Sequence, residues 1–155
     1  MNKMIQFTIA GLLGLGIVTA AVAADITRPE EQILTRQAGY KFMAWNMGKI
    51  KANLAGDYNQ QQVKAAANTI AAIANSGMGA LYGPGTDKNI GTVETRAKAD
   101  IFTDKEKVIE LARQFVTAAN QLAEIATNGD KDAVKQAFGQ VGQSCKSCHD
   151  KFRAD

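Results

Sequence analysis

DKDAVKQAFGQVGQSCKSCHDKF, residues 130–152, is the most informative stretch of this sequence. Its apolar residues recur at alternating steps of three and four, which predicts one amphipathic helix with Asp130 as its N-cap. Both cysteines face the core side of that helix, and His149 lies one turn beyond Cys145. The predicted seam is Val134, Ala137 or Phe138, Val141, Cys145, Cys148 and Phe152.

The segment Cys145-Lys146-Ser147-Cys148-His149 holds both cysteines of the chain and its only histidine. Two thiols at i and i+3 lie on one helix face, where they can add to the two vinyl groups of a porphyrin as thioethers. The next residue's imidazole can then bind the iron, and this spacing is the attachment signature of c-type haem. We therefore predict one covalent haem on Cys145 and Cys148, with His149 as an axial iron ligand.

Three other interpretations of this cluster are weaker. A disulfide between i and i+3 closes a very small loop, so it would stabilise the fold little. A structural zinc site needs four Cys or His ligands, and the chain has three in total. A thioredoxin-like pair lies at a helix N-terminus in a βαβ context, whereas this pair lies late in a predicted helix.

Three more segments show the same periodicity, and runs with strand-like alternation are missing. The chain is therefore predicted to be all-α, an antiparallel up-down-up-down four-helix bundle with a long loop between the second and third helices. That Gly-rich loop covers about residues 76–102 and is expected to include a short helical turn. The other helices are expected at Pro29–Leu54, Gln60–Asn75 and Asp104–Thr127, with start signals at Thr27 with Glu30, Asn59 with Gln62, and Thr103 with Glu106.

Residues 1–23 are predicted to be a cleaved signal peptide. Lys3 precedes an apolar stretch rich in Gly and Ala, and Ala21-Val22-Ala23 supplies the small residues that signal peptidase needs. Cleavage before Ala24 or before Asp25 fits. A membrane anchor fits less well because the uninterrupted apolar stretch is short. We therefore expect a single exported domain, residues 24–155, with no membrane span.

The charge of the chain excludes a nucleic-acid footprint. Without the predicted leader, 17 basic residues stand against 15 acidic ones, which leaves a net charge of +2. The basic residues are also scattered rather than clustered.

The face of the iron opposite His149 depends on the first predicted helix. Tyr40 is either a core tyrosine or a roof over a vacant iron face. Arg36 is either a snorkelling residue or the partner of a haem propionate, and the cost of burying an unpaired guanidinium favours the propionate. The candidates for a sixth ligand are Met43, Met47, Met78, a lysine or no side chain, and seam methionines more often fill a core.

A set of motifs spread over residues 24–155 resembles cytochrome c′, the high-spin class II c-type cytochromes, and looks closest to those of purple sulfur bacteria. The motifs are Pro29-Glu30-Glu31, Thr35-Arg36-Gln37, Tyr40, Met43, Gly83-Pro84-Gly85-Thr86, Ala137-Phe138-Gly139, Val141-Gly142 and the run from Cys145 to Arg153.

The resemblance implies a periplasmic protein, usually a homodimer paired through its first two helices, with one haem whose iron is five-coordinate. It assigns Cys145 and Cys148 to the thioethers and His149 to the proximal ligand. It also implies that Tyr40 occupies the distal position, that Arg36 and Gln37 lie on the propionate side, that Arg153 lies beside the proximal pocket, and that Thr95 contacts the haem.

Two functions follow from these expectations. A vacant distal site under Tyr40 admits small gases such as NO and CO, and a low-spin branch of class II cytochromes instead has a Met ligand near this position. The alternative is an electron-transfer cytochrome with a redox protein partner, in a periplasmic respiratory or photosynthetic chain. An enzyme such as a peroxidase is not expected, because that chemistry needs a distal acid–base group, normally a second histidine.

Overall fold

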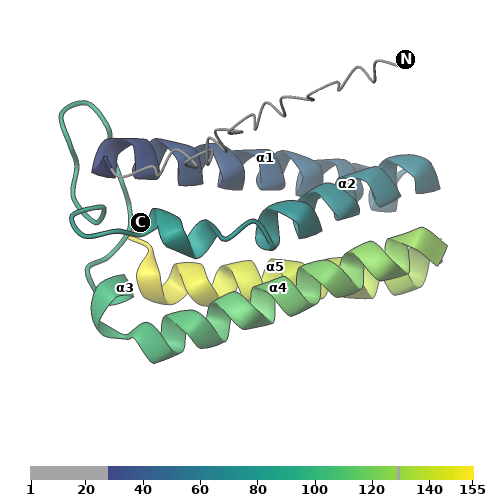
Figure 1. Cartoon of the computed structure of the whole chain (residues 1–155). Coiled ribbons are helices and arrows are strands. Elements are labelled where there is room, and N and C mark those ends of the chain that lie inside the picture. The colour runs from purple at the N-terminus through teal and green to yellow at the C-terminus, as the bar shows by residue number, and fades with distance from the viewer. Residues whose placement is uncertain (1–27, 129) are drawn as a thin grey trace, which may run out of the picture.

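The computed structural model describes residues 28–128 and 130–155, and its regular elements are helices, with no strand among these residues (Figure 1). This result confirms the predicted all-α class. The predicted signal peptide and Thr27 lie outside the described residues. The long helices are α1 (Pro29–Ala55), α2 (Gln60–Ala74), α4 (Lys105–Asn128) and α5 (Lys131–Phe152); the short ones are η1 (Met78–Leu81) and α3 (Asp100–Thr103).

Two of the predicted helix starts are confirmed by their capping bonds. The Asn59 side chain accepts a hydrogen bond from the backbone N–H of Gln62 at 3.0 Å, at the start of α2. The Asp130 carboxylate accepts from the backbone N–H groups of Asp132 and Ala133, at 2.9 and 3.3 Å. Each bond satisfies a donor that the helix itself leaves unpaired.

The predicted capping box at Thr103 is wrong. Thr103 is the last residue of α3, and the next residue, Asp104, caps α4 by accepting from the backbone N–H of Lys107 at 3.3 Å. The start of α1 also differs from the expectation. Arg28 occupies its N-cap position without a side-chain capping bond, and instead its side chain forms an ion pair with Glu31.

The hydrophobic core runs along the facing seams of the four long helices. Many of its members are alanines, which let neighbouring helices approach closely, and each larger aliphatic chain contributes about 1.5–3 kcal/mol through burial. The core consists of Met43, Ile50, Val63, Ala66, Ala67, Ile70, Ala118, Ala119, Leu122, Ala126, Val134, Ala137 and Val141.

The four sides of the bundle are not packed equally. Helix α2 packs closely on both α1 and α4, and α4 packs closely on α5, whereas α1 and α5 make few contacts with each other. The side between α1 and α5 is therefore the open side of the bundle. Cys148, near the end of α5, lies on this side, close enough to Tyr40 of α1 for the two side chains to interact electrostatically.

The segment between α2 and α4 lies at the end of the bundle where α1 begins and α5 ends (Figure 1). It joins the C-terminus there, because Lys98 N–H donates to the carbonyl of Phe152 at 2.9 Å and Ala154 N–H donates to the carbonyl of Arg96 at 2.8 Å. The same segment is fixed to α1 at Gly83, whose N–H donates to the side chain of Gln32 at 2.9 Å. A Cβ at Gly83 would lie 2.6 Å from that Gln32 oxygen, so a larger residue there would push the Gln32 amide away and disturb this hydrogen bond.

Candidate haem site

The two cysteines lie one turn apart near the end of α5. Both are free thiols and both are partly buried. Burial raises the pKa of the Cys145 thiol and of the Cys148 thiol, so both carry their protons at neutral pH. Because the chain has only these two cysteines, the disulfide alternative is not what the structure contains.

His149 follows Cys148 and is exposed at the surface. Partial burial of the ring and the charge of Arg96 lower the pKa of His149, which favours the neutral imidazole that binds metals. Its Nδ1 lies 3.4 Å from an Nη atom of Arg153, the C-cap residue of α5. Arg153 therefore lies beside the predicted iron ligand.

Tyr40 lies on α1 and is 40% exposed, so it is not a core tyrosine. Its hydroxyl lies 3.1 Å from the hydroxyl of Tyr82, and both phenols are close enough to Cys148 to interact with its thiol electrostatically. Burial of the hydroxyl groups raises the pKa of Tyr40 and of Tyr82. The structure thus brings the predicted distal residue of α1 close to a predicted haem-attachment residue of α5.

Arg36 is buried, with 3% of its surface exposed. Its guanidinium donates to the carbonyl of Leu81 at 3.0 Å, to the carbonyl of Thr86 and to the hydroxyl of Thr95 at 2.8 Å. Burial lowers its pKa, but an arginine stays protonated in proteins. The structure gives this cation three oxygen partners without a propionate, so the cost of an unpaired guanidinium no longer argues for one.

Gln37 and Thr95 belong to the same group of contacts. The Gln37 amide donates to the carbonyl of Glu94 at 2.7 Å, and the Thr95 hydroxyl accepts from Ala97 N–H at 3.2 Å as well as from Arg36. The structure therefore brings Arg36, Gln37 and Thr95 together, although they are far apart in sequence.

Sequence reasoning missed two residues of this group, Tyr82 and Thr86. Thr86 is fully buried, and the Tyr82 ring lies beneath the Arg36 guanidinium, 4.3 Å from its carbon to the ring centroid. The available signal was the Gly83-Pro84-Gly85-Thr86 turn, which the resemblance had marked and which directly follows Tyr82.

The three methionines named as possible sixth ligands take part in packing. Met43 is 6% exposed in the core, and Met47 packs against that core. The thioether of Met78 lies against α1, with its sulfur 3.2 Å from the position that a Cβ on Gly39 would occupy.

These observations fit a covalently attached haem. Two free thiols and a neighbouring imidazole lie on one helix end, a phenol of α1 lies near one thiol, and α1 and α5 pack only weakly on each other. Among the described residues, nothing outside the local backbone of α5 lies within 4 Å of the position of a Cβ on Gly139 or Gly142, so α5 is unobstructed there. The zinc alternative lacks ligands, because residues 28–128 and 130–155 contain no group of three His, Cys, Asp or Glu side chains placed to hold a metal.

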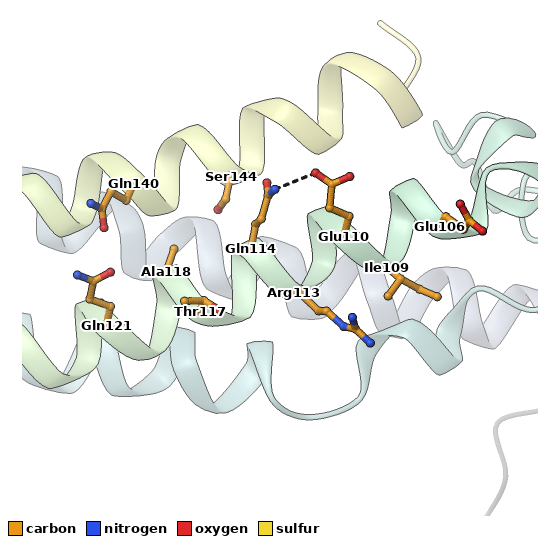
Figure 2. A pocket seen from close by; sticks show the side chains of 10 residues that line it. All are labelled: Glu106, Ile109, Glu110, Arg113, Gln114, Thr117, Ala118, Gln121, Gln140 and Ser144. Carbon is orange, nitrogen blue, oxygen red and sulfur yellow. Dashed lines mark hydrogen bonds between the residues drawn. The ribbon is translucent and has the colours of Figure 1, made fainter.

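A hollow of about 740 Å³ lies between α4 and α5, away from the side between α1 and α5 (Figure 2). Gln140 and Ser144 of α5 face it, together with polar side chains of α4 such as Glu110 and Gln114, which are hydrogen-bonded to each other at 3.0 Å. None of the predicted haem-site residues lines this hollow.

Comparison with known proteins finds close similarity over almost the whole chain. The family model described as Cytochrome C' matches residues 31–153. The cytochrome c' of Allochromatium vinosum is 64% identical over 154 residues, which cover 99% of each chain. The crystal structure of cytochrome c' from Thermochromatium tepidum is 67% identical, with a TM-score of 0.83 over 85% of this chain and all of that one.

Other solved relatives carry information on ligands and assembly. One cytochrome c' structure, 69% identical with a TM-score of 0.82 over 83% of this chain and 98% of its own, is described as having an unusual ligand-controlled dimer dissociation. Mutants of the cytochrome c prime from Alcaligenes xylosoxidans, 29% identical with a TM-score of 0.73, have been solved as nitric oxide and carbon monoxide complexes; 83% of this chain and 98% of each of those chains are covered. In the described part of this chain, no helix is both long enough and apolar enough to cross a membrane.

Proposed function

This chain belongs to the cytochrome c′ family, and we propose that it is a periplasmic haem protein whose five-coordinate iron binds small gases such as NO and CO. Proteins of this family bind c-type haem. Cys145 and Cys148 would hold the haem through thioethers, and His149 would be the proximal ligand. The bound haem supplies an iron with one coordination position left for a gas.

The position of Tyr40 is the observation that carries this proposal. Its phenol lies near Cys148 and is held by Tyr82, yet 40% of the residue is exposed on the weakly packed side of the bundle. A haem attached to Cys148 would therefore have this aromatic side chain beside it. Met43 and Met47 are already used in core packing, which supports an iron without a thioether ligand.

The chemistry around Tyr40 favours uncharged diatomic ligands. A phenol ring placed over an iron offers an apolar surface, and a ligand has to displace that ring to reach the metal. The bulk of Tyr40 would thus select small molecules. Mutants of an Alcaligenes xylosoxidans homologue have been solved with nitric oxide and with carbon monoxide bound, which supports gas binding. Following the family resemblance, we assign Arg36 and Gln37 to the propionate side of the haem, Thr95 to a contact with the haem, and Arg153 to the proximal pocket.

The remaining assignments concern location and assembly. We propose that residues 1–23 direct export and are cleaved, and that two copies pair through α1 and α2. The large apolar side chains exposed on α1, Leu34, Phe42 and Trp45, support this pairing. The dimer described for a solved relative supports it as well.

A visible absorption spectrum of the exported holoprotein tests the proposal. After reduction with dithionite we expect a broad band without sharp α and β peaks, and a shift of the spectrum when CO is added. A sharp α band that does not respond to CO would contradict the five-coordinate iron and favour electron transfer with a redox partner. The absence of a Soret band, in a host able to attach c-type haem, would rule out the haem assignment itself.

A further inference from the structure

Tyr82 follows η1 in the segment between α2 and α4, and its side-chain hydroxyl forms a hydrogen bond with that of Tyr40. The two hydroxyl oxygens lie 3.1 Å apart, so one phenol donates to the other. Burial raises the pKa of both phenols, so both remain neutral at physiological pH. The contact is therefore a neutral hydrogen bond between α1 and the segment that follows α2.

The ring of Tyr82 is itself held in place. The guanidinium carbon of Arg36 lies 4.3 Å from the ring centroid, within the range of a cation–π contact. Arg36 is held in turn by two backbone carbonyls of the same segment, that of Leu81 just before Tyr82 and that of Thr86 four residues after it. Tyr82 is therefore held by contacts that do not depend on Tyr40.

We propose that Tyr82 is a positioning residue that holds Tyr40 over the distal face of the haem and slows the access of gases to the iron. This inference rests on the proposed function, in which a ligand must displace Tyr40. Displacement of Tyr40 breaks the Tyr40–Tyr82 hydrogen bond, because Arg36 keeps Tyr82 where it is. The bond thus adds to the barrier for binding and has no role once the ligand has entered.

The direct test is the rate of CO association with the reduced holoprotein, measured by stopped flow. Tyr82→Phe keeps the ring beneath Arg36 and removes only the hydroxyl. Loss of one neutral hydrogen bond from the resting state should speed CO association by about 2- to 10-fold. Tyr58→Phe is the matched control. It removes the hydroxyl of the one other tyrosine in the sequence, which lies between α1 and α2, and it should leave the rate of CO association unchanged.

A double-mutant cycle separates positioning from a general loosening of the protein. Tyr40→Phe removes the other half of the bond, so adding Tyr82→Phe to it should give no further acceleration. Tyrosine ultraviolet resonance Raman spectra give a readout that does not depend on gas binding. Tyr82→Phe should change the phenol hydrogen-bond signature of Tyr40, and Tyr58→Phe should not.

The failures of the two proposals are distinguishable. If Tyr40→Ala accelerates CO binding but Tyr82→Phe does not, the inference about Tyr82 is overturned and the proposed function stands. The inference is also overturned if Tyr82→Phe accelerates binding equally in the presence and absence of the Tyr40 hydroxyl. If Tyr40→Ala leaves the rate unchanged, Tyr40 does not cover the iron: the inference about Tyr82 and the distal role of Tyr40 both fail, while the binding of CO itself stands.

Discussion

The buried guanidinium of Arg36 connects α1 to the segment between α2 and α4 at the candidate site. Its bonds to Leu81, Thr86 and Thr95 connect α1 to three points of the segment between α2 and α4. Hydrogen bonds from a charged donor are stronger than neutral ones, and the carbonyls they satisfy are shielded from water. The stability of this segment should therefore depend on Arg36 more than on other arginines of the chain.

Replacing Arg36 by Met tests this dependence. Met has a similar length and an apolar character, but it leaves the Leu81 and Thr86 carbonyls without their donor. We expect the free energy of unfolding of the holoprotein to fall by about 2–5 kcal/mol, measured by denaturant titration. Arg113→Met, at an exposed position of α4, is the control and should change it by no more than about 0.5 kcal/mol. Equal effects of the two substitutions would show that the segment does not rely on Arg36.

The helices were predictable where the signal is local. Asn59 and Asp130 bond to backbone groups two or three residues away, so their sequence positions were enough to place two helix starts. Thr103 and Asp104 are neighbours that can both cap a helix, and only the extra turn of α3 decides for Asp104. The two residues alone do not predict where α3 ends, so they do not predict which of them caps α4.

The buried polar positions of α1 were not predictable from apolar periodicity. Asn46 and Asn53 are almost fully buried, because their amides donate to the carbonyls of Phe42 and Lys49 four residues earlier in the same helix. This bonding removes the penalty that would otherwise keep an amide at the surface.

The candidate site also contains a local part that the sequence predicts and a long-range part that it does not. The Cys145–His149 cluster is contiguous, so its spacing alone predicted the haem chemistry. The pairing of Tyr40 with Tyr82 joins a helix to an irregular segment 42 residues later. No periodicity in the sequence encodes that distance, and the resemblance supplied Tyr40 without its partner.

The N-cap of α5 gives a prediction for the helix that we propose carries the haem. Asp130 accepts two backbone hydrogen bonds at the start of α5, and Cys145 lies several turns away. We expect Asp130→Ala to lower the free energy of unfolding by about 1 kcal/mol, measured by denaturant titration, because the cap is lost. The visible spectrum should stay the same. Asp57→Ala, in the turn after α1, removes a carboxylate without removing a helix cap; a loss as large as that of Asp130→Ala would contradict a capping role.

At the scale of the whole molecule, α1 carries several exposed apolar side chains. Phe42 and Trp45 are 49% and 57% exposed, and their rings stack with centroids 5.3 Å apart. The Lys49 ammonium lies 4.1 Å from the Trp45 ring centroid, and Leu34 is exposed further along the helix. Exposed apolar clusters of this kind mark contact surfaces. In a symmetric pair the same cluster meets its own copy, so one substitution is present twice in the interface.

Phe42→Glu should therefore separate the proposed dimer. The substitution buries a carboxylate without a partner, facing its own symmetry mate. It should raise the dissociation constant of the dimer by about 100-fold or more, measured by sedimentation equilibrium of the holoprotein. Ile109→Glu is the matched control, since Ile109 is also 49% exposed but lies on α4, and it should leave the dissociation constant unchanged. Both variants should keep the visible spectrum, because neither residue belongs to the candidate haem site. If Ile109→Glu dissociates the dimer and Phe42→Glu does not, the interface lies on α4 instead of α1.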